Sequence, residues 1–357
     1  MSEKKTALYA THEELGARFT DFGGWSMPVR YASDTAEHHA VRRGAGIFDL
    51  SHMGEVEVSG PQAGAFLDFA LVGVLSAMSV GRAKYSVIVD ADGRVLDDLI
   101  TYRLEENRYL VVPNAGNQEV VVRELTARAE GFDVAVTDQG AETSLIAVQG
   151  PRALEVLKAT DLDPSDVVEN LKYYAAAPAR CAGVEVLAAR TGYTGEDGFE
   201  LYCSNQDAPA LWAALLETAG ELSTEDAPVS AAGLAARDSL RLEAGMPLYG
   251  HELSTEITPQ RPVWASSWRS RCARRAKRER TRWAARRSPP WSRPNPSAPW
   301  WAWKAWAASR SAPTTPWCPA ARPWVSSPAD CPRPRWASPL PWPSWPRTRW
   351  LGSPTAT

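Results

Sequence analysis

The chain has 357 residues and a formal net charge of −3 at pH 7, with 44% hydrophobic and 23% charged residues, so it is long enough to bury a substantial core. Its five cysteines form no C-x-x-C pair and have no histidine at metal-ligand spacing, which disfavours a zinc site or a disulfide framework. The charged N-terminus lacks the apolar segment of a signal peptide and no run of 18 apolar residues occurs, so we expect a cytoplasmic protein without membrane contact.

Strand-like and helix-like segments mix irregularly through the first 260 residues. Short runs with β-type composition predict strands at 55–58, 84–89, 99–103, 109–112, 145–148, 184–189 and 199–202. Apolar residues at three- and four-residue spacing predict helices at 62–71, 115–129, 152–158, 208–222 and 231–243. The Asp-Ala-Asp-Gly sequence at 90–93 lies between two predicted strands and predicts a hairpin turn. The pattern indicates a mixed α+β fold rather than strict βαβ alternation.

Two adjacent carboxylates, Asp97 and Asp98, precede the apolar segment 99–103. Because side chains alternate along a strand, the two must point to opposite faces. We expect one to be solvated and the other to turn inward, where a buried carboxylate needs a partner. A pair of Asp residues at a turn is the structural alternative, because Asp is common at turns.

A glycine-rich loop at 190–198 joins two predicted strands and contains Tyr193, with Glu200 following in the second strand. Such a loop suits the wall of a site for a flat ligand, or it is a long hairpin with glycines at positive φ. The charged residues Arg237, Asp238, Arg241 and Glu243 share the following helix, where a solvated face is the commoner outcome. No G-x-G-x-x-G after a strand, Walker loop or Ser/His/Asp set occurs, so nucleotide and serine-hydrolase functions are disfavoured.

Six motifs share the order and spacing of one enzyme family. They occupy residues 21–28 (DFGGWSMP), 48–54 (FDLSHMG), 97–99 (DDL), 148–151 (VQGP), 190–200 (RTGYTGEDGFE) and 234–249. Over residues 5–259 the chain closely resembles the aminomethyltransferases, the T proteins of the glycine cleavage system. The resemblance implies a three-part folate-binding fold, with the pterin in a central channel and a C-terminal β-barrel domain closing one side. The folate domains of sarcosine and dimethylglycine dehydrogenases share this fold and are the main alternatives.

The resemblance also implies a reaction. T proteins take the aminomethyl group from the lipoyl arm of the H protein, release ammonia and leave the one-carbon unit on tetrahydrofolate as 5,10-methylenetetrahydrofolate. Tetrahydrofolate is then the cosubstrate, the lipoylated H protein is the partner, and no metal or nicotinamide is required.

By position, Asp98 matches the catalytic carboxylate of the family. The family's folate-site positions fall on Tyr85, Ile100, Tyr102, Asn114, Tyr173, Tyr174, Tyr193, Glu200 and Arg237. Aromatic rings suit a flat pterin, Glu200 would accept from its N–H groups, and Arg237 offers a fork for a carboxylate or carbonyl. We expect Asp98→Asn to retain folate binding and lose most turnover, and Asp97→Asn to be mild.

The composition changes sharply after Gln260. Before this point 20 lysines and arginines stand against 40 acidic residues, giving −20, and after it 19 stand against 2, giving +17. The second part also holds 14 of the 16 tryptophans and 18 of the 28 prolines. A GC-rich gene translated in the wrong frame gives this composition, because TGG, CGN, CCN and GCN codons then dominate.

Back-translation supports the same interpretation. Residues 282–291, written in GC-rich codons and read two bases later, give LGREALAAV, and LGREAL is typical of T proteins. The same shift applied to 260–267 and 324–342 can give further T-protein-like sequence in the right order. We therefore predict a catalytic region at 1–259 and a disordered, out-of-frame tail at 260–357 in place of the barrel domain, with weak folding or loss of activity as the expected cost.

Two other functions are consistent with parts of the sequence. A non-catalytic folate-binding protein of the same fold is one, although the match at Asp98 disfavours it. The other is nucleic-acid or membrane binding through the basic, tryptophan-rich segment 269–287. Its irregular proline and tryptophan spacing fits neither a helix face nor a known binding module, so we expect no nucleic-acid or membrane partner.

Overall fold

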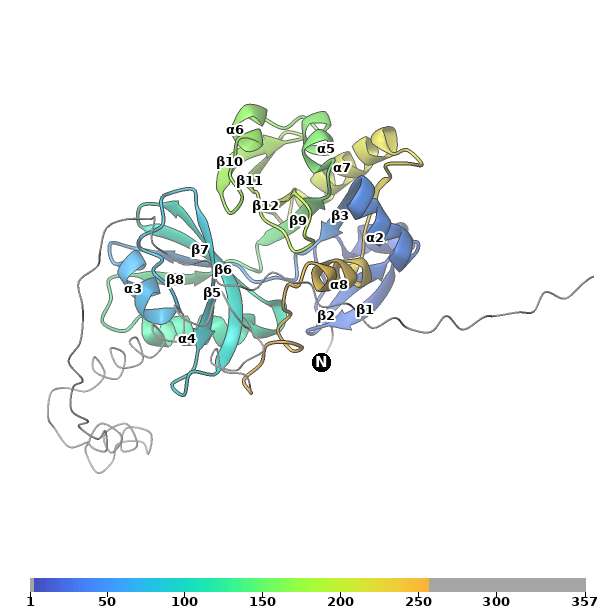
Figure 1. The fold of residues 1–357 in the computed structure, drawn as a ribbon. Helices are drawn as coiled ribbons and strands as arrows, with labels where there is room; N and C mark the ends of the chain where they lie inside the picture. The colour runs from blue at the N-terminus through green and yellow to red at the C-terminus, as the bar shows by residue number, and fades with distance from the viewer. Residues whose placement is uncertain (1–2, 257–357) are drawn as a thin grey trace, which may run out of the picture. The chain divides into compact units, whose positions relative to one another are not determined.

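A computed structural model describes residues 3–256 of the chain, all of which lie in one compact unit. The described part combines a six-stranded sheet, a five-stranded sheet and a two-stranded hairpin with helices, which confirms the α+β prediction (Figure 1). The predicted tail at 260–357, and its boundary with the catalytic region, lie outside the described residues. Among the described residues, no helix is long and apolar enough to cross a membrane.

The six-stranded sheet is built around strands that are buried on both faces. Its order is β10 (Ala176–Cys181), β11 (Val184–Ala189), β12 (Gly198–Ser204), β9 (Thr143–Gln149), β3 (Ala45–Asp49) and β13 (Val229–Ala231). All neighbours are antiparallel except β13, which runs parallel to β3. Six of the seven residues of β12 are buried, so Glu200 has little access to water from this strand.

Helices cover one face of this sheet. α5 (Ala153–Ala159) and α7 (Ala208–Leu222) place Val156, Leu211 and Trp212 in one core cluster with Val148 and Leu201 of the central strands. The Trp212 side chain is fully buried, and its ring meets that of His12 edge-on at 5.0 Å. Burial of large apolar side chains, at roughly 1.5–3 kcal/mol each, is the main term holding this layer together. The short helix α6 (Ser165–Glu169) adds Val168 to the same cluster.

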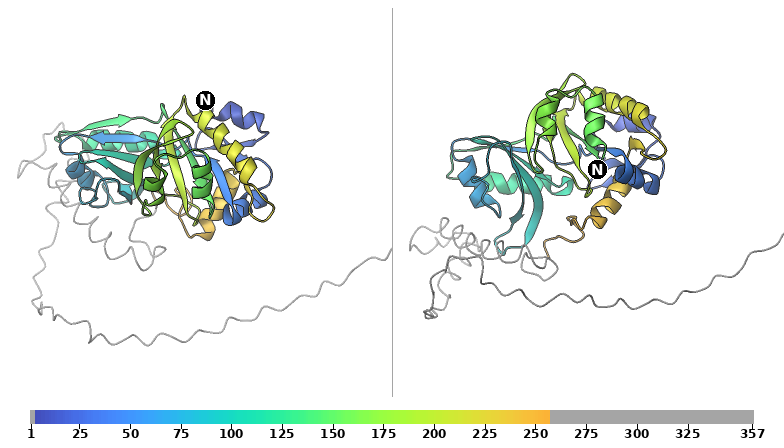
Figure 2. Two further views of the ribbon diagram at one scale, coloured as in Figure 1. Left: turned by 90° about the horizontal axis from the view of Figure 1, so that it is seen from above. Right: turned by 45° about the horizontal axis from the view of Figure 1, so that its top comes forward.

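The five-stranded sheet is antiparallel throughout. Its order is β5 (Ala83–Val89), β6 (Val95–Glu105), β7 (Arg108–Pro113), β4 (Val56–Ser59) and β8 (Ala135–Asp138). α3 (Ala63–Ala70) and α4 (Gln118–Arg128) pack on one face, with Phe66 and Leu125 against Leu99 and Val111. Figure 2 shows the two sheets from two further directions.

A second core cluster joins the other face of the five-stranded sheet to the six-stranded sheet. Tyr102 and Val112 lie in it beside Phe48 and Ala147, with Leu240 of α8 (Leu234–Glu243). The hairpin β1 (Arg18–Phe22) and β2 (Trp25–Arg30), with α2 (Asp34–Arg43), packs next to α8, and α1 (Tyr9–Glu14) precedes it. Side chains on this face of β6 therefore point toward the six-stranded sheet.

Main-chain hydrogen bonds also join the two sheets. The Ala83 N–H donates to the Tyr174 carbonyl at 2.9 Å, and the Ala176 N–H donates to the Gly81 carbonyl at 2.8 Å. Tyr174 has φ of +61°, a left-handed conformation that costs about 1 kcal/mol or more for a non-glycine residue. This contact holds the residues around Tyr174 at the edge of β5.

Every predicted strand and helix has a counterpart in the structure. The predicted strand at 184–189 and the predicted helix at 208–222 have the observed limits, and residues 90–93 form the turn between β5 and β6. The predicted helix at 231–243 starts at Leu234, because residues 229–231 extend the six-stranded sheet as β13. The 115–129 segment opens with a 3-10 turn, η1 (Ala115–Asn117), before α4.

Candidate functional site

Asp98 lies on the face of β6 that points toward the six-stranded sheet. Ile100 and Tyr102 follow it on the same face, because alternate residues of a strand share a side. The Asp98 side chain is only 9% exposed, and its oxygens accept from Tyr85 Oη at 2.8 Å and from Asn114 Nδ2 at 2.9 Å. Burial raises the pKa of the Asp98 carboxyl, and these two hydrogen bonds oppose that rise.

Asp97 points to the opposite face of β6, as predicted, but it is not solvated. Its side chain is fully buried and accepts from the Asn114 N–H at 2.9 Å, Asn114 Nδ2 at 2.9 Å and Asn117 Nδ2 at 2.6 Å. The expectation of one solvated carboxylate was wrong, because η1 and α4 cover this side of the strand. Burial raises the pKa of the Asp97 carboxyl to about 7 in spite of the hydrogen bonds.

Glu200 on β12 is held by hydroxyl groups. Its Oε2 accepts from Thr191 Oγ1 and, at 3.4 Å, from Tyr102 Oη, while Tyr102 and Thr191 share a hydrogen bond of 2.9 Å. Tyr202 Oη donates to Tyr102 Oη at 3.3 Å. Burial, together with the Glu200 charge, raises the pKa of Tyr102 well above its usual value, so this phenol stays protonated.

Arg237 supplies a positive charge to the same region. Its guanidinium carbon lies 4.8 Å from the centre of the Tyr193 ring, a cation–π distance, and its charge interacts with Glu200. The Arg237 Nη1 atom is buried and has no hydrogen-bond partner among the residues that the structure describes. A buried guanidinium nitrogen without a partner is costly, and a ligand oxygen at this position would satisfy it.

Tyr173 and Tyr174 complete the aromatic set. Their ring centres are 4.7 Å apart, Tyr174 is partly buried, and Tyr173 is 54% exposed. The Tyr174 phenol interacts electrostatically with both Tyr85 and Glu200. Tyr174, in the segment before β10, is therefore near both Glu200 and the Tyr85 phenol that bonds Asp98, and Tyr173 is the more exposed of the two tyrosines.

The loop at 190–198 is fixed by close packing as well as by glycine conformation. Gly195 has φ of +81°, as the hairpin interpretation expects. Gly192 and Gly198 instead approach the buried Gln149 side chain, where an added Cβ would lie 2.0 and 2.6 Å from carboxamide atoms. Gln149 Nε2 donates to the Thr191 carbonyl at 3.0 Å, so two of the sequence motifs contact each other directly.

The charged helix α8 is only partly a solvated face. Arg241 is 3% exposed and pairs with Asp238 and Glu252 at 2.8 and 2.7 Å, and Arg237 also turns inward. Asp238 and Glu243 stay exposed, so the expectation of a solvated face was wrong for the two arginines. The reason is that α8 packs on β2 and α2 instead of lying free on the surface.

Three polar residues near this region were not predicted from the sequence. Thr191 Oγ1 donates to the Glu200 carboxylate, and Tyr202 Oη donates to the Tyr102 phenol. His52 lies close enough to Arg237 for the guanidinium charge to act on its ring. His52 is buried, its ring Nδ1 has no partner among the described residues, and burial lowers its pKa to about 4. Thr191 lies in the family motif 190–200 and His52 in the motif 48–54, and this was the only indication of them in the sequence.

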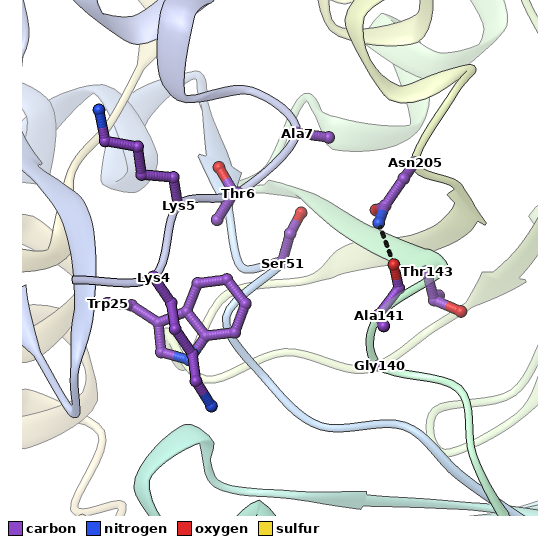
Figure 3. Close-up of a pocket in the computed structure, with 10 residues that line it drawn as sticks. All are labelled: Lys4, Lys5, Thr6, Ala7, Trp25, Ser51, Gly140, Ala141, Thr143 and Asn205. Atoms are coloured by element: carbon purple, nitrogen blue, oxygen red, sulfur yellow. Dashed lines mark hydrogen bonds between the residues drawn. The ribbon is translucent and has the colours of Figure 1, made fainter. Parts of the chain in front are cut away.

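A separate pocket of about 330 Å³ lies near the N-terminus of the described part. Figure 3 shows Lys4 and Trp25 side by side on one side of it, with Asn205 bonded to the Ala141 carbonyl on the other. None of its ten lining residues belongs to the Asp98 and Glu200 region. Among residues 3–256, no group of three or more His, Cys, Asp or Glu side chains could hold a metal ion.

Comparisons with known proteins all indicate the same family. Residues 8–262 match the GCVT N-terminal domain. A curated aminomethyltransferase of Cutibacterium acnes is 56% identical over 262 residues, which cover 72% of this chain and 69% of the relative. A second, from Corynebacterium jeikeium, is 54% identical over 269 residues, covering 72% and 68%. The chain belongs to the aminomethyltransferase family of the glycine cleavage system.

A solved structure of this family has the same fold. The crystal structure of the glycine cleavage system aminomethyltransferase T from Bartonella henselae superposes with a TM-score of 0.65 at 39% identity, covering 72% of this chain and 67% of that one. The aminomethyltransferase fold expected for the first 260 residues is thereby confirmed. The match covers about two thirds of the length of each of these three relatives.

Proposed function

We propose that the chain binds tetrahydrofolate between β6, β12 and α8 and uses Asp98 to assist transfer of a one-carbon unit to it. The donor is the aminomethyl group on the lipoyl arm of the H protein, and the products are ammonia and 5,10-methylenetetrahydrofolate. Lipoylated H protein is thus the proposed partner, the cytoplasm the proposed compartment, and no metal, membrane or nucleic acid is required.

The observation that carries this proposal is the convergence of Asp98, Glu200 and Arg237 around a set of tyrosines. The Asp98 oxygens each accept one hydrogen bond, which leaves further lone pairs for ligand N–H groups. Arg237 Nη1 is a buried donor without a partner in the described part of the chain. Donors, acceptors and aromatic faces together match a pterin ring and its p-aminobenzoyl group better than a small polar metabolite.

Asp98 suits the transfer step for an electrostatic reason. A carboxylate fixed by Tyr85 and Asn114 in a mostly buried position can stabilise positive charge that develops on the methylene carbon and the attacking nitrogen. It can also accept a proton from that nitrogen within hydrogen-bond reach. Tyr85, Ile100, Tyr102, Asn114, Tyr173, Tyr174, Tyr193, Glu200 and Arg237 are the proposed folate-site residues.

Asp98→Asn tests the catalytic part. We expect tetrahydrofolate binding by the 357-residue chain to stay within about threefold and turnover to fall about 10²- to 10⁴-fold, measured as ammonia release from aminomethylated H protein. Asp226→Asn, at an exposed loop position, is the matched control and should leave both unchanged. Absence of folate binding by the wild-type chain would contradict the proposal. Folate binding without turnover would contradict its catalytic part if turnover were also absent from the protein translated in the corrected frame, and a non-catalytic folate-binding protein would then be favoured.

We further propose that residues 260–357 are out-of-frame sequence. Support comes from the change of composition at Gln260, the family match that ends at residue 262, and relatives matched over only 67–69% of their length. Sequencing the coding DNA across the codons for residues 258–261 decides the matter. One inserted or lost base there would support the proposal, and an intact reading frame would contradict it.

A further inference from the structure

The Asp97 carboxylate accepts three hydrogen bonds and the Asp98 carboxylate accepts two, although Asp97 faces away from the site. It is fully buried on the helix-covered side of β6 and accepts three N–H groups, two of them from Asn114. The main-chain N–H and the side-chain carboxamide of Asn114 bind different oxygens of the same carboxylate. Two contacts to one residue fix both its backbone and its side-chain rotamer.

The Asn114 carboxamide also reaches the other carboxylate. Its Nδ2 lies 2.9 Å from Asp98 Oδ1 and 2.9 Å from the Asp98 carbonyl. Asn114 follows the end of β7, where its neighbour Pro113 pairs with Leu99, so the loop lies directly beside the Asp pair. The nitrogen therefore bridges the two sides of β6, with Asp97 on one side and Asp98 on the other.

Asp98 is left with one defined orientation. Asn114 holds Oδ1 and Tyr85 holds Oδ2 at 2.8 Å, which sets the plane of the carboxylate. Catalytic groups need to be held within a fraction of an ångström, and their supporting residues provide this order. Without Asp97, the Asn114 carboxamide would lose one of the three oxygens near its Nδ2 and its main-chain N–H would lose its acceptor, so its orientation toward Asp98 would be less well fixed.

We infer that Asp97 is a positioning residue that acts on Asp98 through Asn114. The inference rests on the proposed function, since it assigns Asp98 the transfer step. It replaces the expectation that Asp97→Asn is mild, which assumed a solvated side chain. Asp97 is not one of the proposed folate-site residues, and it contacts the site through Asn114.

Kinetics of the full chain test this assignment. For Asp97→Asn we expect kcat to fall about 10- to 100-fold with tetrahydrofolate affinity within about threefold, because ground-state contacts are kept while the transition-state geometry is lost. Asn114→Ala should have a similar effect on kcat, and the double variant should be no worse than Asn114→Ala alone. Asn117→Ala removes one hydrogen bond to Asp97 but leaves Asn114 in place, so it is the control and should retain kcat within about threefold.

The pH profile supplies a readout that a purely structural role would not change. Loss of the Asn114 donor removes one interaction that lowers the pKa of Asp98. Asp97→Asn and the double variant both lack the Asp97 charge, so the acidic limbs of their kcat/KM profiles should coincide if Asn114 no longer donates to Asp98 in Asp97→Asn. Burial raises the pKa of Asp97 to about 7 in the wild type, so the comparison is made between two variants that lack this carboxyl group. The other titratable groups around the pair are the phenols of Tyr85, Tyr193 and Tyr249, and burial raises the pKa of all three. They stay neutral from pH 5 to 9 and do not mask a difference between the two variants.

The outcomes separate the inference from the proposed function. A wild-type kcat in Asp97→Asn, with an acidic limb at lower pH than in the double variant and a lower melting temperature, would overturn the inference. Multiplicative effects of the Asp97 and Asn114 substitutions would overturn it as well. If Asp97→Asn does not fold, Asp97→Ser carries the same test. If the wild-type chain shows no turnover, the proposed function fails. A ¹³C NMR titration of the Asp98 carboxyl still decides the inference, because its pKa in Asp97→Asn should equal that in the double variant, and a lower value would overturn it.

Discussion

Each of the two sheets contributes a carboxylate to the candidate site, and the two are held in different ways. Asp98 on β6 is bonded by Tyr85 on the neighbouring strand β5 and by Asn114 at the end of β7, all within one sheet. Glu200 on β12 is bonded by Tyr102 from the other sheet and by Thr191 from the preceding loop. The position of Asp98 therefore depends on local strand pairing, and that of Glu200 depends on how the sheets and the loop pack together.

The largest effect is expected where the loop and β12 meet β9. In Gly198→Ala the new Cβ would lie 2.7 Å from the Val148 carbonyl and 2.6 Å from the Gln149 carboxamide, so the strands must shift. We expect a loss of about 2–3 kcal/mol in the free energy of unfolding, measured by thermal or urea unfolding, together with weaker folate binding. Gly220→Ala, at an open position of α7, is the control and should stabilise by about 0.5–1 kcal/mol. Normal stability and folate binding in Gly198→Ala would show that the position of Glu200 does not depend on how the loop and the strands pack.

Glu200→Gln separates the two carboxylates by function. Because it removes the charge opposite Arg237 and replaces one of the two proposed acceptor oxygens by an NH2 donor, we expect tetrahydrofolate affinity to fall about 10- to 100-fold in a binding titration. This is the opposite of Asp98→Asn, for which turnover falls and binding is kept. Glu185→Gln, exposed on the neighbouring strand β11, should change neither. If Glu200→Gln instead lost turnover alone, the division between binding and transfer would be wrong.

The smallest effect on stability is expected at Glu55, a buried carboxyl group that differs from both Asp98 and Glu200. It is fully buried, both carboxyl oxygens lack a hydrogen-bond partner among the described residues, and burial raises its pKa well above the usual value. A raised pKa in the folded state means that this group favours folding below about pH 4.5 and that the benefit is lost as pH rises through the folded pKa. The free energy of unfolding, measured by thermal unfolding, should therefore fall less between pH 5 and 8 in Glu55→Gln than in the wild type. Identical pH dependence in the two proteins would show that Glu55 ionises freely in the fold.

Local sequence patterns were sufficient for elements whose periodicity is regular. The helix α7 and the strand β11 were predicted with their observed limits, because one face of each is apolar at the spacing of its own secondary structure. The strand β3 was missed because all five of its residues are buried and show no alternation. The hairpin β1–β2 was missed for the opposite reason, since β1 is mostly exposed and its sequence is polar.

The sequence by itself determined the family, the α+β class, the turn at 90–93 and the opposite orientation of Asp97 and Asp98, because each depends on neighbouring residues or on motifs in fixed order. The tertiary structure alone decided that both carboxylates are buried, that Asn114 bridges them, and that Arg241 turns inward. It also decided that Tyr102 meets Glu200, a residue 98 positions away in the chain. Burial and hydrogen bonding at these positions depend on elements that come together only when the sheets pack, and local periodicity carries no record of that packing.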